Sequence, residues 1–171
     1  MNPIIPQMLG IFGLFIIVIS FQCKQNRNFF LMQGIGSLFF FLNFILIGAY
    51  GGAFFNLANL IRGLLFSKDA KKLWKLLVIE AIYIGCLVFS IFLDNSLKQM
   101  ILTLFPFSAL IIMSVFMWKG NPKNIRYFQI AYMSPSWIVY NCFNLSVGGI
   151  ICETFNMISS FVYLIIEKKN K

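Results

Sequence analysis

The sequence contains no histidine and few charged residues. Of its 171 residues, only 5 are aspartate or glutamate, and charged residues make up 11%, against about 25% in an ordinary soluble domain. The absence of histidine removes the side chain that most often serves as a general base or metal ligand. The scarcity of charge excludes a solvated surface of the kind that a soluble globular enzyme needs, and the aromatic content of 18% excludes a disordered chain.

Apolar residues take the place of the missing charges. They make up 60% of the chain, more than so small a protein can bury away from water. Four cysteines occur, but no two form a CxxC pair and no spacing indicates zinc. We therefore expect a protein that has lipid as its solvent, with cysteines that act as small core residues.

Seven apolar runs have the length of a membrane-spanning helix, which needs about 20 residues (range about 17–25). They cover about residues 4–22, 29–49, 52–66, 76–93, 100–118, 127–143 and 147–166. The first run lacks a basic start and a small-residue cleavage site, so we expect a permanent helix rather than a signal peptide.

Lysine and arginine residues are segregated between the joints. Thirteen of the 14 lie at the ends of the first, third, fifth and seventh runs: twelve follow a run, and Arg62 lies one turn inside the end of the third. Only Lys98 lies among the other joints. The thirteen are Lys24, Arg27, Arg62, Lys68, Lys71, Lys72, Lys75, Lys119, Lys123, Arg126, Lys168, Lys169 and Lys171. Because basic loops stay in the cytoplasm, seven spans place the amino terminus outside and the carboxyl terminus in the cytoplasm. The net charge of +9 then reflects membrane topology, and no nucleic-acid partner is predicted.

An internal repeat relates the two halves of the chain at an offset of 97 residues. Two joints that are almost free of polar residues align, and so do the basic joints and the lengths of the runs. The aligned pairs include Gly51 with Gly148, Gly52 with Gly149, Asn43 with Tyr140, Asn56 with Glu153, and Asn59 with Asn156. Three helices, one linker and three helices put both copies in the same orientation, a parallel repeat.

We therefore predict an all-α polytopic membrane protein of seven transmembrane helices, folded as a single integral membrane domain over residues 1–171. Repeat one covers about residues 4–66, a linker helix about 76–93, and repeat two about 100–166. The two repeats are expected to form two parallel three-helix bundles. In such folds the substrate site lies near the midplane, between the halves.

Two polar stripes occur inside the predicted spans. Asn56, Asn59 and Arg62 follow one another at steps of three, and Glu153 and Asn156 occupy the matching places in the last span. A carboxylate at the centre of a spanning helix costs about 2.5–3.5 kcal/mol on insertion scales. Either these residues face a pathway for a polar solute, or they form hydrogen bonds between helices. Arg62 lies near the cytoplasmic end, where we expect its side chain to extend to water.

Other polar residues allow two interpretations each. Trp137, Tyr140 and Asn141 share one helix face, where an aromatic ring beside an amide can hold a ring or a sugar. Alternatively, Tyr140 belongs to the aromatic belt at the outer surface. Glu80 lies about one turn from Lys75, which favours a local ion pair.

Two prolines lie inside predicted spans. Pro106 and Pro135 each remove a backbone hydrogen bond from a helix. They are candidate hinges for alternating access or, equally, kinks that shape static packing.

The chain offers little for catalysis. It has no nucleophile–base pair, phosphate loop, nucleotide fingerprint or metal cluster. We therefore predict that it is not an enzyme and has no cofactor and no metal site.

Several motifs carry a resemblance to a known family. They are Trp137-x-x-Tyr140-Asn141, Ser146-Val147-Gly148-Gly149-x-x-x-Glu153, Gln33-x-x-Gly36, and Leu46-x-Gly48-Ala49-Tyr50 with Asn56 and Arg62. In these motifs the chain resembles the YgjV family of bacterial inner membrane proteins over nearly its whole length. More distantly, the three-plus-one-plus-three repeat looks like SWEET sugar carriers and PnuC-type vitamin-precursor transporters, although the chain lacks their proline–glutamine loop motif. That second resemblance implies facilitated diffusion of a small polar solute through a central pocket.

Two functions remain open from the sequence. The first is a small facilitative transporter of a polar metabolite in the bacterial inner membrane, with the lipid bilayer and the solute as partners. Its predicted site comprises Asn56, Asn59, Trp137, Asn141, Glu153 and Asn156. The second is a non-transporting accessory protein whose polar stripes are packing contacts. Both a monomer and a homo-oligomer are compatible with either function.

Overall fold

Seven helical segments make up the part of the chain that the structure describes. This computed structural model describes residues 4–20, 23, 25–68, 71–94 and 96–169, without the side chain of Asn26. The segments are α1 (Ile4–Ser20), α2 (Asn26–Ile47), α3 (Tyr50–Lys68), α4 (Leu73–Leu93), α5 (Leu97–Lys119), the continuous α6 (Pro122–Phe128), η1 (Gln129–Met133) and α7 (Ser134–Phe143), and α8 (Val147–Lys169). The predicted all-helical class and the seven helices are confirmed. Gln22, Lys24 and Lys171, which entered the predictions, lie outside the described residues.

Local sequence signals explain where several segments begin and end. Gly48 and Gly120 follow α2 and α5 with φ of +78° and +69°, a left-handed conformation that glycine adopts without strain. At the start of α6, the Asn121 side chain accepts hydrogen bonds from the backbone N–H groups of Lys123 (3.1 Å) and Asn124 (3.3 Å). These turns reverse the chain over a few residues, so consecutive helices pack side by side.

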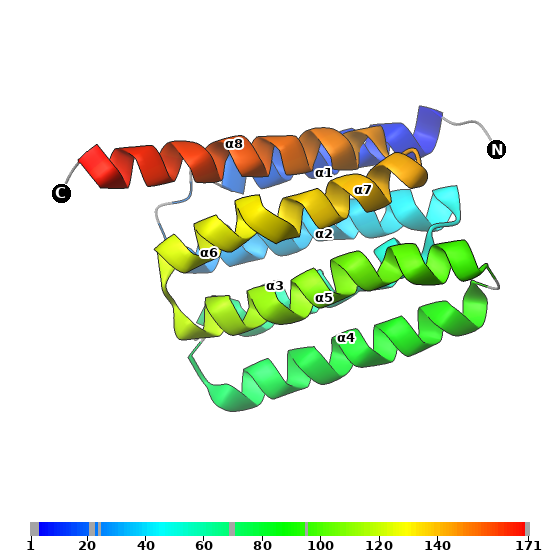
Figure 1. Cartoon of the computed structure of the whole chain (residues 1–171), viewed down its shortest axis with the longest axis horizontal. Helices are drawn as coiled ribbons and strands as arrows, with labels where there is room; N and C mark the ends of the chain where they lie inside the picture. The colour runs from blue at the N-terminus through cyan, green and yellow to red at the C-terminus, as the bar shows by residue number, and fades with distance from the viewer. Residues whose placement is uncertain (1–3, 21–22, 24, 69–70, 95, 170–171) are drawn as a thin grey trace.

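Six of the segments form a closed ring, and α4 lies outside it. Going round the ring, α1 packs on α2, α2 on α3, α3 on α5, α5 on the α6–η1–α7 segment, that segment on α8, and α8 on α1. Helix α4 packs on α3 and α5 from the outer side, at the edge of the bundle opposite α1 and α8 (Figure 1). A linker outside the ring joins the two halves without entering the space between them.

The predicted pair of three-helix bundles is not confirmed as two separate units. In each predicted half, the first and third helices pack mainly on the middle helix rather than on each other. The close contact of α1 with α8 joins the halves into one body. Helices α1 and α8 can approach so closely because each carries a glycine where they meet, Gly10 and Gly148.

The outer surface of the bundle is apolar. Large hydrophobic side chains remain exposed around the bundle, among them Leu77 (60%) and Phe92 (77%) of α4 and Ile158 (58%) of α8. Four helices of the described chain are long and apolar enough to cross a membrane: Arg27–Ile47, Leu73–Leu93, Leu97–Lys119 and Val147–Lys169. Helix α1 is apolar but shorter, and α3 and the α6–η1–α7 segment carry polar residues that face inward.

The contact between α1 and α8 depends on two glycines. A Cβ atom built on Gly148 would lie 2.5 Å from the backbone carbonyl carbon of Gly10, too close for the present separation of the helices. The backbones approach so closely only because neither residue has a side chain, as is common between helices in membranes.

We expect Gly148→Ala to lower the free energy of unfolding by about 1–3 kcal/mol, because α1 and α8 must separate to accept the methyl group. Denaturant unfolding of the purified protein in detergent measures the change. Gly85→Ala is the matched control, since a Cβ there meets nothing within 4 Å on the outer face of α4. It should leave stability unchanged or raise it slightly, and equal losses in the two variants would contradict the assigned role of Gly148.

Candidate functional site

The ring surrounds a cavity of about 610 Å³. Every ring helix contributes to its wall, whereas no residue of α4 does. The aromatic residues of the wall are Phe29, Phe30, Phe40, Phe44, Phe66 and Trp137. The polar and charged residues are Gln33, Ser37, Asn56, Asn59, Arg62, Ser67, Lys68, Lys71, Arg126, Gln129, Asn141, Glu153 and Asn156. This volume and mixture are those of a small-molecule site.

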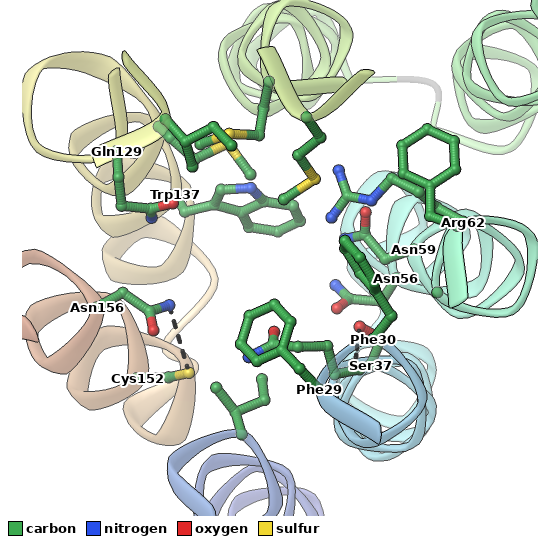
Figure 2. A pocket seen from close by; sticks show the side chains of 18 of the residues that line it. Phe29, Phe30, Ser37, Asn56, Asn59, Arg62, Gln129, Trp137, Cys152 and Asn156 are labelled. Carbon is green, nitrogen blue, oxygen red and sulfur yellow. Dashed lines mark hydrogen bonds between the residues drawn. The ribbon is translucent and has the colours of Figure 1, made fainter. Parts of the chain in front are cut away.

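All six predicted site residues lie on the wall of this cavity. They come in pairs from three helices: Asn56 and Asn59 from α3, Trp137 and Asn141 from α7, and Glu153 and Asn156 from α8. Figure 2 shows Asn56 and Asn59 of α3 on one side of the cavity and Asn156 of α8 on the other. Trp137 of α7 also borders this space. Residues that are 97 apart in the predicted repeat therefore occupy opposite walls.

Each asparagine of the α3 wall is fixed by a hydrogen bond, one within α3 and one from α4. Asn56 Nδ2 donates to the carbonyl oxygen of Gly52 in its own helix (2.8 Å). Asn59 Oδ1 accepts a hydrogen bond from the Tyr83 hydroxyl of α4 (2.6 Å). Helix α4 thus orients a cavity residue from outside the ring.

The opposite wall is built around the carboxylate of Glu153. Its Oε2 accepts from Ser134 Oγ (2.7 Å) and from Gln129 Nε2 (3.4 Å). Gln129 Nε2 also donates to Ser134 Oγ (2.7 Å), so the three side chains form one network. Gln129 begins the π-helical η1, and Ser134 follows its last residue. Such π-helical segments are frequent at functional sites.

Trp137 forms a rigid surface beside the network. Only 4% of this residue is exposed, and its ring packs against Phe44 (6.1 Å between centroids) and Tyr140 (5.8 Å). Asn141 lies one turn away, and a Cβ on Gly149 would lie 2.7 Å from its side chain, so Gly149 leaves room for the amide. The Oδ1 atom of Asn141 is buried and has no hydrogen-bond partner.

Comparison with known families identifies the chain. Residues 4–170 match the Imp-YgjV family, described as bacterial inner membrane protein. The chain belongs to this family. No match was found among curated proteins or among solved structures, so the likeness to SWEET and PnuC-type carriers is not shown.

Three functional candidates of the Imp-YgjV chain are not among the six predicted site residues: Gln129 and Arg62, which line the cavity, and Ser134, which contacts Glu153. Gln129 and Ser134 hold Glu153, and only their place near a buried carboxylate makes them functional candidates. Arg62 lies three residues after Asn59 on the same polar stripe, and this spacing is the sequence signal that could have marked it as a site residue. Its guanidinium points into the cavity toward Trp137 (Figure 2). Since Nη1 is buried, the prediction that this side chain reaches water is wrong for that atom.

A set of buried hydrogen bonds closes the end of the bundle where α3 and α8 begin. The Tyr140 hydroxyl accepts a hydrogen bond from the backbone N–H of Gly52 in the first turn of α3 (2.7 Å). Ser146 Oγ, just before α8, donates to Asn43 Oδ1 (2.9 Å), and Asn43 Nδ2 donates to the carbonyl oxygen of Pro6 (2.7 Å). Each middle helix therefore binds the start of the other half's third helix.

This arrangement corrects two interpretations. Tyr140 is fully buried, so it does not belong to an aromatic belt at the surface. Lys75 does not pair with Glu80: its Nζ donates to the carbonyl oxygen of Leu65 (2.6 Å), and both Glu80 carboxylate oxygens are buried without a hydrogen-bond partner.

The two predicted hinges lie outside the cavity wall. Pro106 is buried in the middle of α5, which continues through it. Pro135 stands in the first turn of α7, directly after η1. The break in regular α-helix thus precedes Pro135, and the hinge role of both prolines stays a prediction.

We expect Tyr140→Phe to lower the free energy of unfolding by about 1–3 kcal/mol, because the Gly52 N–H loses its acceptor in a buried place. Unfolding in detergent measures the loss. Tyr127→Phe, on a residue that is 54% exposed, is the matched control and should unfold like wild type. If both variants unfold like wild type, the Tyr140 hydroxyl does not stabilise the closed end.

Proposed function

We propose that this Imp-YgjV chain is a small carrier, not an enzyme, that moves a polar solute across the bacterial inner membrane through the central cavity. The observation that carries the proposal is the gathering of all six predicted site residues around one cavity. A cavity lined by amides, a carboxylate and an indole provides hydrogen bonds and a flat apolar surface for a small metabolite.

Seven passes are the topology that the proposal requires. The ring segments run back and forth along the long axis, and α1 begins at the end opposite to where α8 finishes (Figure 1). A helix of 17 residues such as α1 rises about 25 Å, close to the hydrocarbon thickness of about 30 Å. The segregation of basic residues supports an amino terminus outside and a carboxyl terminus in the cytoplasm.

The state of the cavity supports an inward-facing carrier. At the basic end of the bundle its wall includes Lys68, Lys71 and Pro122. At the other end, Tyr140 and Asn43 close the bundle by the hydrogen bonds described above. Opening the outer end would require those bonds to break while the inner end closes, the rocking motion of alternating access.

The reciprocal contacts support the predicted parallel repeat. Asn43 and Tyr140 are repeat partners in the sequence alignment, and each bonds to the segment that begins the third helix of the other half. A two-fold axis along the membrane normal would generate such a pair of contacts. Movement of one half would then alter both contacts together.

The alternative function is a non-transporting accessory protein that binds a partner in the membrane. It is favoured by the hydrogen bond between Asn59 and Tyr83, which is a packing contact between helices. Polar stripes that served only for packing would meet each other, whereas here they lie on opposite sides of a cavity. That difference favours the carrier.

Access of water to position 156 separates the two functions. In a variant whose native cysteines are replaced by alanine, Asn156→Cys should react with a membrane-impermeant thiol reagent added from the cytoplasmic side. The physical reason is that Asn156 lines a cavity that reaches the basic end. Labelling in inside-out membrane vesicles, read by a mass shift on a gel, measures it.

The matched control is Ile158→Cys, two residues further along α8 and 58% exposed on the lipid-facing side. Because thiols in lipid do not ionise or meet a water-soluble reagent, it should stay unlabelled. Absence of reaction at position 156 in folded protein would favour the accessory function.

A solute that binds this cavity should stabilise the folded protein. Thermal unfolding in detergent, in the presence of each member of a library of sugars, nucleosides, vitamins and organic acids, measures this effect. A ligand at one hundred times its dissociation constant should raise the free energy of unfolding by about 2.7 kcal/mol. We expect Glu153→Gln and Asn156→Ala to remove the shift for any hit, and to abolish its uptake into vesicles, without lowering the amount of folded protein. Uptake that persists in both variants would show that the pathway does not pass these residues.

A further inference from the structure

The cavity wall carries more positive than negative charge. Arg62, Arg126, Lys68 and Lys71 line it, and Glu153 is the one carboxylate among the wall residues that the structure describes. The acceptor capacity of Glu153 Oε2 is already used by Ser134 and Gln129. We propose that the solute is a small organic anion, with its anionic group bound between Arg62 and Asn59. This proposal rests on the carrier function and names the class of solute.

Arg62 lies too deep to act only as part of the basic end. It precedes Lys68 by six residues, a rise of about 9 Å along α3. Its Nη1 is buried and makes no hydrogen bond, and a buried N–H group without an acceptor is costly. Guanidinium groups bind carboxylates and phosphates through paired N–H donors. A solute anion would supply the missing acceptor.

Asn59 is oriented to donate at the same place. Its Oδ1 already accepts the Tyr83 hydroxyl (2.6 Å), so its two N–H donors remain for the cavity. Arg62 and Asn59 are three residues apart on one helix face, and Figure 2 shows both directed into the cavity. Two neighbouring donor groups without an acceptor between them fit an anion better than a neutral solute. The indole of Trp137 faces them across the cavity and provides a surface for the body of the solute.

A structural role for Arg62 would involve Glu80 of α4. Both carboxylate oxygens of Glu80 are buried without a hydrogen-bond partner, and no ion pair within 4 Å joins them to Arg62 in the part of the chain that the structure describes. If Arg62 were kept to neutralise Glu80, its removal would destabilise the protein. If it is kept for an anionic solute, its removal in the absence of solute should leave the melting temperature unchanged or higher.

The charge preference of the cavity can be measured with a cysteine at position 56. Asn56 lies on α3, beyond Arg62 as seen from the basic end, so a reagent that enters there must pass the guanidinium. Two methanethiosulfonate reagents of equal length serve as probes, one with a sulfonate and one with a trimethylammonium group. The reaction rate of each reagent at position 56 is divided by its rate with a free thiol in solution. The experiment uses the full-length protein in detergent, with its native cysteines replaced.

We expect the sulfonate reagent to react at Asn56→Cys at least tenfold faster than the trimethylammonium reagent after this correction. Adding Arg62→Gln should reduce the preference several-fold, and Arg62→Lys should largely retain it. Arg27→Gln is the matched control, an exposed arginine outside the cavity wall, and should change nothing.

The outcomes distinguish this inference from the carrier function. If neither reagent labels position 56 in folded protein, the open cavity and the carrier function fail. If both label it at equal corrected rates, or if Arg62→Gln leaves the preference unchanged, the anionic solute is wrong and the carrier function stands. A marked fall in the melting temperature of Arg62→Gln with an unchanged rate ratio would assign Arg62 to Glu80 instead.

Discussion

The hydrocarbon interior of a membrane offers no water to a polar group, and the arrangement of this chain depends on that constraint. Several of the buried polar side chains lie either at the closed end of the bundle or on the cavity wall. At the closed end they bond to backbone groups that the starts of helices leave unpaired, as Tyr140 does with Gly52. Along the ring interior they line the cavity, where a solute or water can replace the missing partner. The absence of water therefore accounts for the hydrogen bonds at the closed end and for the polar residues on the cavity wall.

The two ends of the bundle differ because different contacts are available to them. Where α1 meets α8, the pairing of Gly10 with Gly148 brings backbones together and leaves no space between the halves. Toward the basic end, long side chains such as Lys68 and Arg126 line the wall instead. The two ends of the cavity therefore differ in chemistry, with close packing of backbones near one end and long cationic side chains at the other.

Helix α4 shows how a residue outside the site can determine its chemistry. It adds nothing to the cavity wall, yet Tyr83 fixes the amide of Asn59 and Glu80 places a buried carboxylate behind α3. A linker required only to join two parallel repeats would not need these polar groups. Through Tyr83, α4 forms a second layer that supports the α3 wall of the cavity.

The sequence by itself determined the helices and the stripes. Apolar runs of spanning length, with basic residues at alternate joints, specify seven helices, because only helices satisfy their backbone groups without water. The spacing of Asn56 and Asn59 places them on one helix face. Tertiary structure decided how the helices meet: one ring rather than two bundles, Tyr140 buried against Gly52, Arg62 turned inward, and Glu153 held at a π-helical break. These features depend on contacts between segments far apart in the chain. Helical periodicity tells which residues share a helix face. It does not tell which faces of different helices pack together, because that pairing depends on the shapes of all the helix surfaces.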